Sequence, residues 1–354
     1  MNLDLGCRRT FFITAGSFAL WLSNPNSLIA AERFNPQSAK ARYIERLRSI
    51  KSSGRVPIID IESSYDPRAI KLDRYTRNMD DAGVAITCMS VDQPGELVKE
   101  GSIWNDHALE AFKQFPSHFI PTGNGGNHPA WTKAELRQRF LEANERRIVE
   151  DGYPLMGEFE VRHYPSPRQL KRGGATVRDV DIPIDGPDME RVFAFAAKTQ
   201  VPFQIHYEIE DRLLPPLGRM LQKYPNAKVI WCHLAQIRYQ NRSTLYNPEF
   251  LAQWLREYPN LYIDMAFGHS TSNYPGSGER HARYWRDTDK WVSLINAQPD
   301  RFLAALDIGG DRMDDIGVTT QTLRQAIEPL APDAREWVSY KSAWKLLFGE
   351  TLTI

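Results

Sequence analysis

Residues 201–208 read Val-Pro-Phe-Gln-Ile-His-Tyr-Glu, and this stretch with the segments after it indicates the class of fold. It is a short apolar run, typical of a buried strand, that ends in titratable side chains. An amphipathic stretch, Arg212–Lys223, follows it, and a second apolar run, Lys228–His233, comes next. A strand, a helical pattern and a second strand make a βαβ unit, and such units build parallel sheets.

The same alternation extends in both directions along the chain. Strand-like runs occur at Val56–Ile61, Val84–Val91, His118–Thr122, Leu155–Val161, Val201–His206, Lys228–His233, Leu261–Phe267 and Arg301–Asp307. Amphipathic stretches separate them, and two more, Thr319–Leu330 and Asp333–Phe348, follow the last run. Eight such strands predict an α/β fold of the closed (β/α)8 TIM-barrel type, as a single domain over residues 32–354. A doubly wound open sheet is the alternative.

Composition narrows the range of partners. The chain has 354 residues, of which 42% are hydrophobic and 25% are charged, as in ordinary globular proteins. Lys and Arg together number 44, as do Asp and Glu, so the formal net charge is zero. Nucleic-acid binding usually needs a basic excess, so we expect no nucleic-acid partner.

The N-terminus reads as a targeting segment. Residues 7–12 are Cys-Arg-Arg-Thr-Phe-Phe, an apolar run continues to about Leu22, and small residues follow at Ala30 and Ala31. Paired arginines before a short apolar run predict a twin-arginine-type signal peptide over residues 1–31, and therefore export to the periplasm. The apolar run is short for a membrane-spanning helix, so we expect no stable membrane insertion. A plain amphipathic tail is the alternative.

Titratable side chains stand at the ends of several predicted strands. A carboxylate or imidazole that follows a run of Val, Ile and Leu needs a partner, because burying it alone is costly. In a barrel these ends share one mouth, where imidazole nitrogens and carboxylate oxygens together can bind a divalent metal ion. Each residue alone could be structural. The side chains concerned are Asp60, Glu62, Glu158, Glu160, His206, Glu208, His233 and Asp307.

Local motifs then point to a family. The order and spacing of several of them resemble the amidohydrolase superfamily, in particular amidohydrolase-2 proteins related to aminocarboxymuconate semialdehyde decarboxylase, over roughly residues 56–350. The motifs are Ile58-Ile59-Asp60, residues 79–84 (Met-Asp-Asp-Ala-Gly-Val), Phe115-Pro116-Ser117-His118, Gly157-Glu158, Ile205-His206, residues 224–230 (Tyr-Pro-Asn-Ala-Lys-Val-Ile) with His233, residues 258–264 (Tyr-Pro-Asn-Leu-Tyr-Ile-Asp), Arg301-Phe302-Leu303 with Asp307, and residues 342–347 (Ser-Ala-Trp-Lys-Leu-Leu).

The resemblance implies roles for four residues. His206 would be a metal ligand, and His233 a second ligand or a catalytic histidine that polarises the substrate. Asp307 would hold the metal and act as general base on its bound water. Glu158 occupies the position where some members place a bridging ligand. The implied cofactor is one divalent metal ion, with zinc the expected metal.

The chain departs from the family in its first strand, where His-x-His is replaced by Glu62 and Ser64. One interpretation keeps a single ion on Glu62, His206 and Asp307, with Glu158 or His233 completing the shell. Another loses the metal, as in the metal-independent lactonases of the superfamily. A third, from a different class, is a non-catalytic periplasmic binding protein on the same barrel.

The resemblance implies an enzyme that hydrolyses an ester, lactone or amide bond of a small carboxylated substrate. A non-oxidative decarboxylase of the same branch is the alternative. We expect long connections at Arg162–Gly186 and Gly268–Arg283 to form pocket walls or lids. By analogy with the family, a homodimer is also an expectation. The residues expected to contact substrate are Arg238, His163, His128 and His269.

Overall fold

The computed structural model describes residues 33–91, 107–123, 125, 129–165, 167–174, 177–235, 243–266 and 287–354. Residues 34–354 form one compact unit. The predicted signal peptide, residues 1–31, lies outside the described residues. So does the whole of the predicted connection Gly268–Arg283.

Within the described residues, eight parallel strands follow one another in chain order, and this order is that of the predicted (β/α)8 barrel. One sheet contains β1, β2 and β3, and the other contains β4, β6, β7, β8 and β9, with the short β5 antiparallel at its edge. The strands are β1 (Ile58–Tyr65), β2 (Val84–Val91), β3 (Phe119–Pro121), β4 (Met156–His163), β5 (Val180–Asp181), β6 (Phe203–Tyr207), β7 (Val229–Trp231), β8 (Leu261–Asp264) and β9 (Phe302–Leu303).

Two seams join these sheets into a barrel. Between β3 and β4, the backbone N–H of Gly123 donates to the carbonyl of Leu155 at 2.9 Å. On the other side, the extended chain after β9 runs beside β1. There the N–H of Ile61 donates to Ala304 at 3.0 Å, and that of Ser64 donates to the carbonyl of residue 308 at 2.7 Å.

A buried carboxylate holds the second seam. Asp60 Oδ1 accepts hydrogen bonds from the backbone N–H of Leu306 at 2.9 Å and of Glu62 at 3.2 Å. Its Oδ2 accepts from the hydroxyl of Ser63 at 2.6 Å. Asp60 is fully buried. Because its side chain binds the backbone of Leu306, the first strand and the chain after the last strand are joined by side-chain as well as backbone hydrogen bonds.

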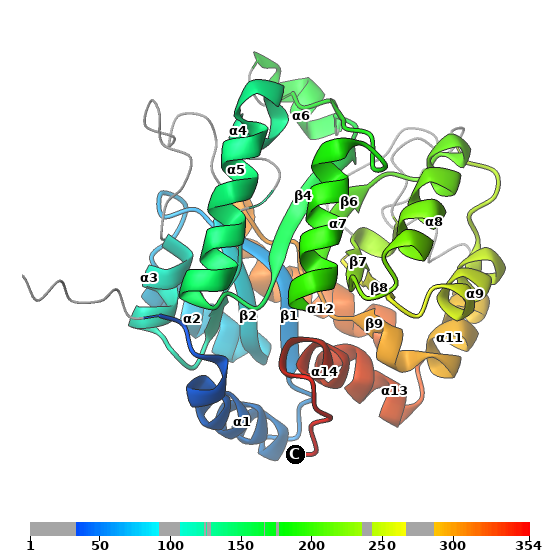
Figure 1. The fold of residues 1–354 in the computed structure, drawn as a ribbon. Coiled ribbons are helices and arrows are strands. Elements are labelled where there is room, and N and C mark those ends of the chain that lie inside the picture. Colours follow the sequence, from blue (N-terminus) through cyan, green and yellow to red (C-terminus); the bar gives the residue numbers. More distant parts are fainter. Residues whose placement is uncertain are drawn as a thin grey trace, which may run out of the picture. The chain divides into compact units, whose positions relative to one another are not determined.

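Helices cover the outside of the barrel, and Figure 1 shows α5 and α7 in front of β4. The predicted amphipathic stretches Arg212–Lys223 and Thr319–Leu330 agree with two of these helices to within three residues. The helices are α1 (Pro36–Ser52), α2 (Leu72–Ala82), α3 (His107–Gln114), α4 (Pro129–Thr132), α5 (Ala134–Arg146), α6 (Pro167–Arg172), α7 (Pro187–Thr199), α8 (Leu214–Lys223), α9 (Pro248–Glu257), α11 (Thr288–Ala297), α12 (Ile316–Ile327), α13 (Pro332–Glu336) and α14 (Ser342–Phe348).

Local sequence explains where individual helices begin and end. At α9, the side chain of Asn247 accepts a hydrogen bond from the N–H of Phe250 at 2.8 Å, and Pro248 occupies the first helical position. At the end of α2, Gly83 adopts φ 72°, a left-handed conformation that a side chain would strain. Such caps fix the points at which the chain turns back toward the barrel.

The core lies on both faces of the sheet. All eight residues of β2 are buried, as expected for a parallel strand inside a barrel with helices outside. Trp231 of β7 packs its ring 6.0 Å from that of Trp254 on α9 and donates its indole N–H to the carbonyl of Tyr207. Tryptophans therefore fill space between strands and helices.

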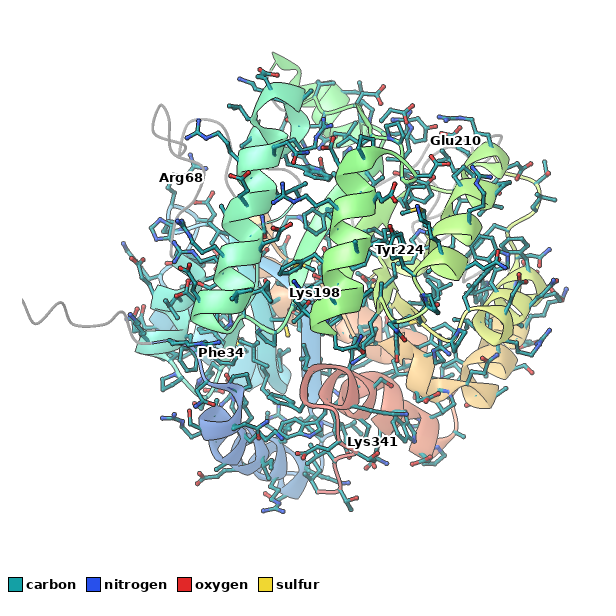
Figure 2. All side chains as sticks on the ribbon, in the orientation of Figure 1. Phe34, Arg68, Lys198, Glu210, Tyr224 and Lys341 are labelled. Atoms are coloured by element: carbon teal, nitrogen blue, oxygen red, sulfur yellow. The ribbon has the colours of Figure 1, made fainter. Side chains whose placement is uncertain are left out.

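The connection after β4 corrects the prediction of one long loop from Arg162 to Gly186. The strand continues to His163, two residues past its predicted end, and the connection contains α6 and β5. The β5 strand pairs antiparallel with the end of β4, with Arg162 opposite Asp181. In Figure 2, Arg68 and Glu210 mark the end of the barrel at which the strands finish, and Lys341 lies near the opposite end.

Candidate metal centre

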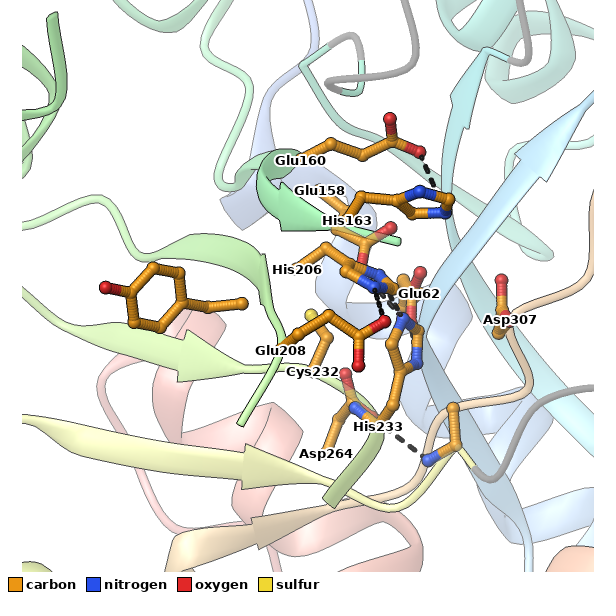
Figure 3. A network of polar contacts seen from close by, with 12 residues as sticks. Glu62, Glu158, Glu160, His163, His206, Glu208, Cys232, His233, Asp264 and Asp307 are labelled. Atoms are coloured by element: carbon orange, nitrogen blue, oxygen red, sulfur yellow. Dashed lines mark hydrogen bonds and ion pairs between the residues drawn. The ribbon is translucent and has the colours of Figure 1, made fainter. Parts of the chain in front are cut away.

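Buried polar side chains gather at the ends of strands from both halves of the barrel, and Figure 3 shows them converging. Five of the strands contribute a side chain that can bind a metal, either from the strand itself or from the residues just after it. The residues are Glu62 from β1, Glu158 from β4, His206 from β6, Cys232 and His233 just after β7, and Asp264 from β8.

Three of these groups meet at very short range. Glu158 Oε1 lies 3.1 Å from His206 Nδ1 and 2.8 Å from His233 Nε2, and the two ring nitrogens are 3.0 Å apart. In a tetrahedral zinc site with bonds of 2.0–2.1 Å, ligand atoms stand about 3.3 Å apart. The three donor atoms therefore need to separate by only a few tenths of an ångström to hold a divalent ion.

Neighbouring groups fix the orientation of His206. Its Nε2 lies 3.3 Å from Glu208 Oε1, and Glu208 is buried. A carboxylate on the second ring nitrogen is the usual support of a metal-ligating histidine. On another side, the rings of His163 and His206 have their centroids 4.7 Å apart, and His163 Nε2 lies 3.7 Å from Glu160 Oε1.

Electrostatics within the cluster favour a carboxylate beside a cation. Burial on its own would raise the pKa of Glu158, but the charges and hydrogen bonds of His233 and His206 hold it well below its usual value. Burial would lower the pKa of His233, but the Glu158 carboxylate outweighs it and raises the pKa to about 9. Without a metal, a proton on His233 supplies the positive charge, and a metal ion bound there would take its place.

On the other edge of the His233 ring lies a second set of acids. His233 Nδ1 is 3.7 Å from Glu62 Oε2, and neither atom has a hydrogen-bond partner. Asp264 Oδ1 accepts from the backbone N–H of His233 at 2.7 Å and of Ala266 at 3.0 Å, while its Oδ2 has no partner. Burial, and then the charge of Glu158, raise the pKa of Glu62 well above its usual value.

Asp307 stands beside the cluster, outside the three closely spaced donor atoms. The guanidinium of Arg312 lies 3.1 Å from its Oδ1 and 3.4 Å from its Oδ2. Its backbone N–H donates to the carbonyl of Glu62 at 3.0 Å, which keeps the two residues adjacent across the seam. The side chain of Asp307 is 27% exposed, so it faces the mouth.

The structure brings some of the predicted site residues together and places others elsewhere or outside the described residues. Glu158, His206 and His233 are brought together, and His163 lies against them as the last residue of β4, where the sequence placed it in a loop. Ser64 contributes its backbone N–H to the seam. Three predicted substrate contacts, Arg238, His128 and His269, lie outside the described residues.

Four residues of this region were not predicted from the sequence. Asp264 ends a strand, so the same strand-end argument would have found it. Cys232 lies in a strand-like apolar run, where a free cysteine resembles a small hydrophobic residue. Arg178, which binds both carboxylate oxygens of Glu160 at 2.6–3.1 Å, and Arg312 carry no signal in the local pattern.

One further finding bears on the expectation of no membrane insertion. Across the described part of the chain, none of the helices combines the length and apolar character needed to cross a bilayer.

Comparison with known proteins adds a family and a fold. The family profile described as Amidohydrolase matches residues 73–302, which is more than half of the chain. An uncharacterised TIM-barrel protein from Bordetella bronchiseptica aligns at a TM-score of 0.52 and 19% identity, over 87% of this chain and 91% of that chain. An amidohydrolase II structure aligns at a TM-score of 0.51 and 16% identity, over 82% of this chain and 99% of that chain. At these identities the structural likeness supports the barrel fold. No curated protein matches the sequence significantly.

Proposed function

This chain belongs to the amidohydrolase family of enzymes, and we propose that it is a metal-dependent hydrolase of a small carboxylated substrate. The single observation that carries the proposal is the convergence of Glu158 Oε1, His206 Nδ1 and His233 Nε2 within 3.1 Å of one another. Two buried imidazole nitrogens and a carboxylate oxygen are the donors that a divalent ion such as zinc takes in proteins.

Glu158, His206 and His233 would hold one divalent ion, and zinc fits their mixture of nitrogen and oxygen donors. When bound, such an ion supplies Lewis-acid polarisation and lowers the pKa of water. Glu208 keeps the ring of His206 oriented through Nε2. The metal-free and non-catalytic alternatives are less consistent with so compact a donor set.

Asp307 is our candidate for the general base. It would accept a proton from the attacking water and return it to the leaving group of an ester, lactone or amide. Its partial exposure lets water and substrate reach the carboxylate. Arg312 orients both carboxylate oxygens, and each oxygen keeps a further lone pair for the proton.

Metal analysis together with product analysis tests this proposal. Purified full-length protein is assayed for bound metal by mass spectrometry, and for turnover of carboxylated esters, lactones and amides, with CO₂ release measured in parallel. We expect His206→Ala to lose the metal. We expect Asp307→Asn to keep it but to lose turnover by a factor of about 10²–10⁴, the range for a general base.

Asp314→Asn is the matched control, because this exposed aspartate lies in the same segment and pairs with Arg74 at the surface. Its activity should equal that of the wild type. A wild-type protein that stays free of metal after reconstitution would refute the metal-dependent reaction. Full activity of Asp307→Asn would refute the role of the base, and CO₂ release without hydrolysis would assign a decarboxylase.

We also propose that the protein is exported, on the strength of the Arg8-Arg9 pair and the apolar run after it. The test is cell fractionation of the wild type and of the Arg8→Lys, Arg9→Lys double variant. The wild type should be found in the periplasm, and the variant should accumulate in the cytoplasm. Equal distribution of the two would contradict a twin-arginine signal.

A further inference from the structure

The proposed reaction leaves a second group of metal-ligating side chains unused. Glu62, Cys232 and Asp264 each offer a donor atom, and these atoms lie within 4.8 Å of one another. The residues come from three places in the barrel: β1, the residue after β7, and the last residue of β8. Glu62 is 7% exposed, Cys232 2% and Asp264 0%, so bulk water reaches none of them freely.

Two of the carboxylate oxygens in this group make no hydrogen bond, and the thiol of Cys232, from the same group, lies beside the Asp264 carboxylate. Glu62 Oε2 and Asp264 Oδ2 are buried and have no hydrogen-bond partner. Rotation of the Asp264 carboxylate, which would move Oδ2 to another position, would break the hydrogen bonds that Oδ1 accepts from the backbone N–H groups of His233 and Ala266. Buried acceptors are normally satisfied, and two that share one small space indicate a missing electropositive partner.

We propose that Glu62, Cys232 and Asp264 form a second cation site, for a borderline divalent ion such as zinc(II), distinct from the Glu158–His206–His233 centre. A thiolate selects against hard ions such as magnesium and calcium, and thiolate with carboxylate suits zinc. The ion would draw the donors together by up to about 1 Å, since ligand atoms in a tetrahedral zinc site stand about 3.6 Å apart when one is sulfur.

His233 lies between the two proposed sites, and it is a ligand of the first site only. Its Nε2 faces Glu158 and His206, and its Nδ1 faces Glu62 Oε2 at 3.7 Å. With Nε2 on the first ion, Nδ1 carries the proton and donates it toward Glu62, a ligand of the second ion. Three protein donors then leave one tetrahedral position on the second ion for a water molecule.

Cobalt(II) loading of the full-length protein tests the second site by a readout that is independent of activity. The protein is stripped with a chelator, reloaded with cobalt(II), and examined for metal content and for the thiolate-to-cobalt charge-transfer absorption. We expect two equivalents of cobalt per chain and a thiolate band in the wild type. Cys232→Ala should lose the band and one equivalent.

Three variants make the result interpretable. Cys88→Ala removes the other buried thiol of the described chain, which is not part of this group, and should leave both signals intact. Asp264→Asn should lose the second equivalent while folding normally, because the amide oxygen can still accept both backbone N–H groups. His206→Ala should lose one equivalent and keep the thiolate band.

The outcomes separate this inference from the proposed function. One equivalent in the wild type, without a thiolate band and lost in His206→Ala, overturns the second site and leaves the first in place. A thiolate band that persists with no ion dependent on His206 supports the second site and overturns the first. A Cys232→Ala protein with the band and stoichiometry of the wild type also overturns the second site.

Discussion

Replacement of Asp60 by asparagine should change how the stability of the barrel depends on pH. Burial raises the pKa of Asp60 from 3.8 to about 7, although the hydroxyl of Ser63 and the backbone N–H groups of Leu306 and Glu62 oppose the rise. An acid whose pKa is higher in the folded state binds its proton more tightly there. Its contribution to stability is therefore complete below about pH 4 and is lost as the pH rises through 7.

The magnitude follows from the two pKa values. A rise from 3.8 to about 7 corresponds to roughly 4 kcal/mol, of which about 3 kcal/mol is lost between pH 4.5 and 8. Asparagine has the same shape, keeps an oxygen for Leu306 and Glu62, and does not titrate. The free energy of unfolding of the wild type, minus that of Asp60→Asn, should therefore fall by about 3 kcal/mol over this range.

Urea denaturation followed by tryptophan fluorescence measures this difference, with chelator present so that metal binding does not contribute. Asp60→Ala is the comparison, because it leaves the backbone N–H groups of Leu306 and Glu62 without an acceptor. Each buried unpaired group costs about 1–3 kcal/mol, so the alanine variant should lose roughly 2–6 kcal/mol at every pH. A difference between wild type and Asp60→Asn that does not vary with pH would refute the reasoning.

Three further predictions concern other parts of the molecule. Glu158→Gln should reduce metal affinity by more than the 10–100-fold typical of a lost supporting residue, as measured by metal competition, and an unchanged affinity would remove this residue from the ligand set. The cations Lys51 and Lys341 outweigh the effect of burial and lower the pKa of Glu336 to about 2, so this acid stabilises the fold above about pH 4.5 and loses that effect as the pH falls toward 2. Glu336→Gln should therefore flatten the acid unfolding curve by about 1–3 kcal/mol, and an unaltered curve would contradict the ion pairs. Arg178→Ala should destabilise the protein by about 3 kcal/mol in thermal or urea unfolding, because the buried carboxylate of Glu160 loses the guanidinium that donates to both of its oxygens; addition of Glu160→Gln should restore most of the loss, and no restoration would argue against the pair.

The barrel itself could be predicted from the sequence because each strand carries its own signal. Runs such as Val84–Val91 are continuously apolar, and the structure buries every residue of that run. The ends of elements were less accurate. The predicted strand at Leu155–Val161 continues to His163 because β5 pairs with its end, and this contact is contributed by residues some 18 positions away in the chain.

The candidate site was predictable where strand ends converge by topology alone. His206 and His233 were expected to share the mouth of the barrel, and their ring nitrogens lie 3.0 Å apart. Arg178 and Arg312 were not predictable, because Arg178 reaches its carboxylate from an irregular segment and Arg312 from a short 3-10 helix, and the paths of both depend on the whole fold. Cys232 follows an apolar run, and hydrophobicity alone does not register that its neighbours are two acids, each with one oxygen that makes no hydrogen bond.

The seam at Asp60 has a consequence for the synthesis of the chain. Asp60 and Leu306, which it binds, are 246 residues apart, so a ribosome adding 5–20 residues per second needs roughly 12–50 s to make the second after the first. Throughout that time one edge of β1 has no partner, and unpaired apolar edges invite association with other chains. A message truncated before the codon for Ile308 would therefore yield a substrate for chaperones and proteases, and no partial enzyme.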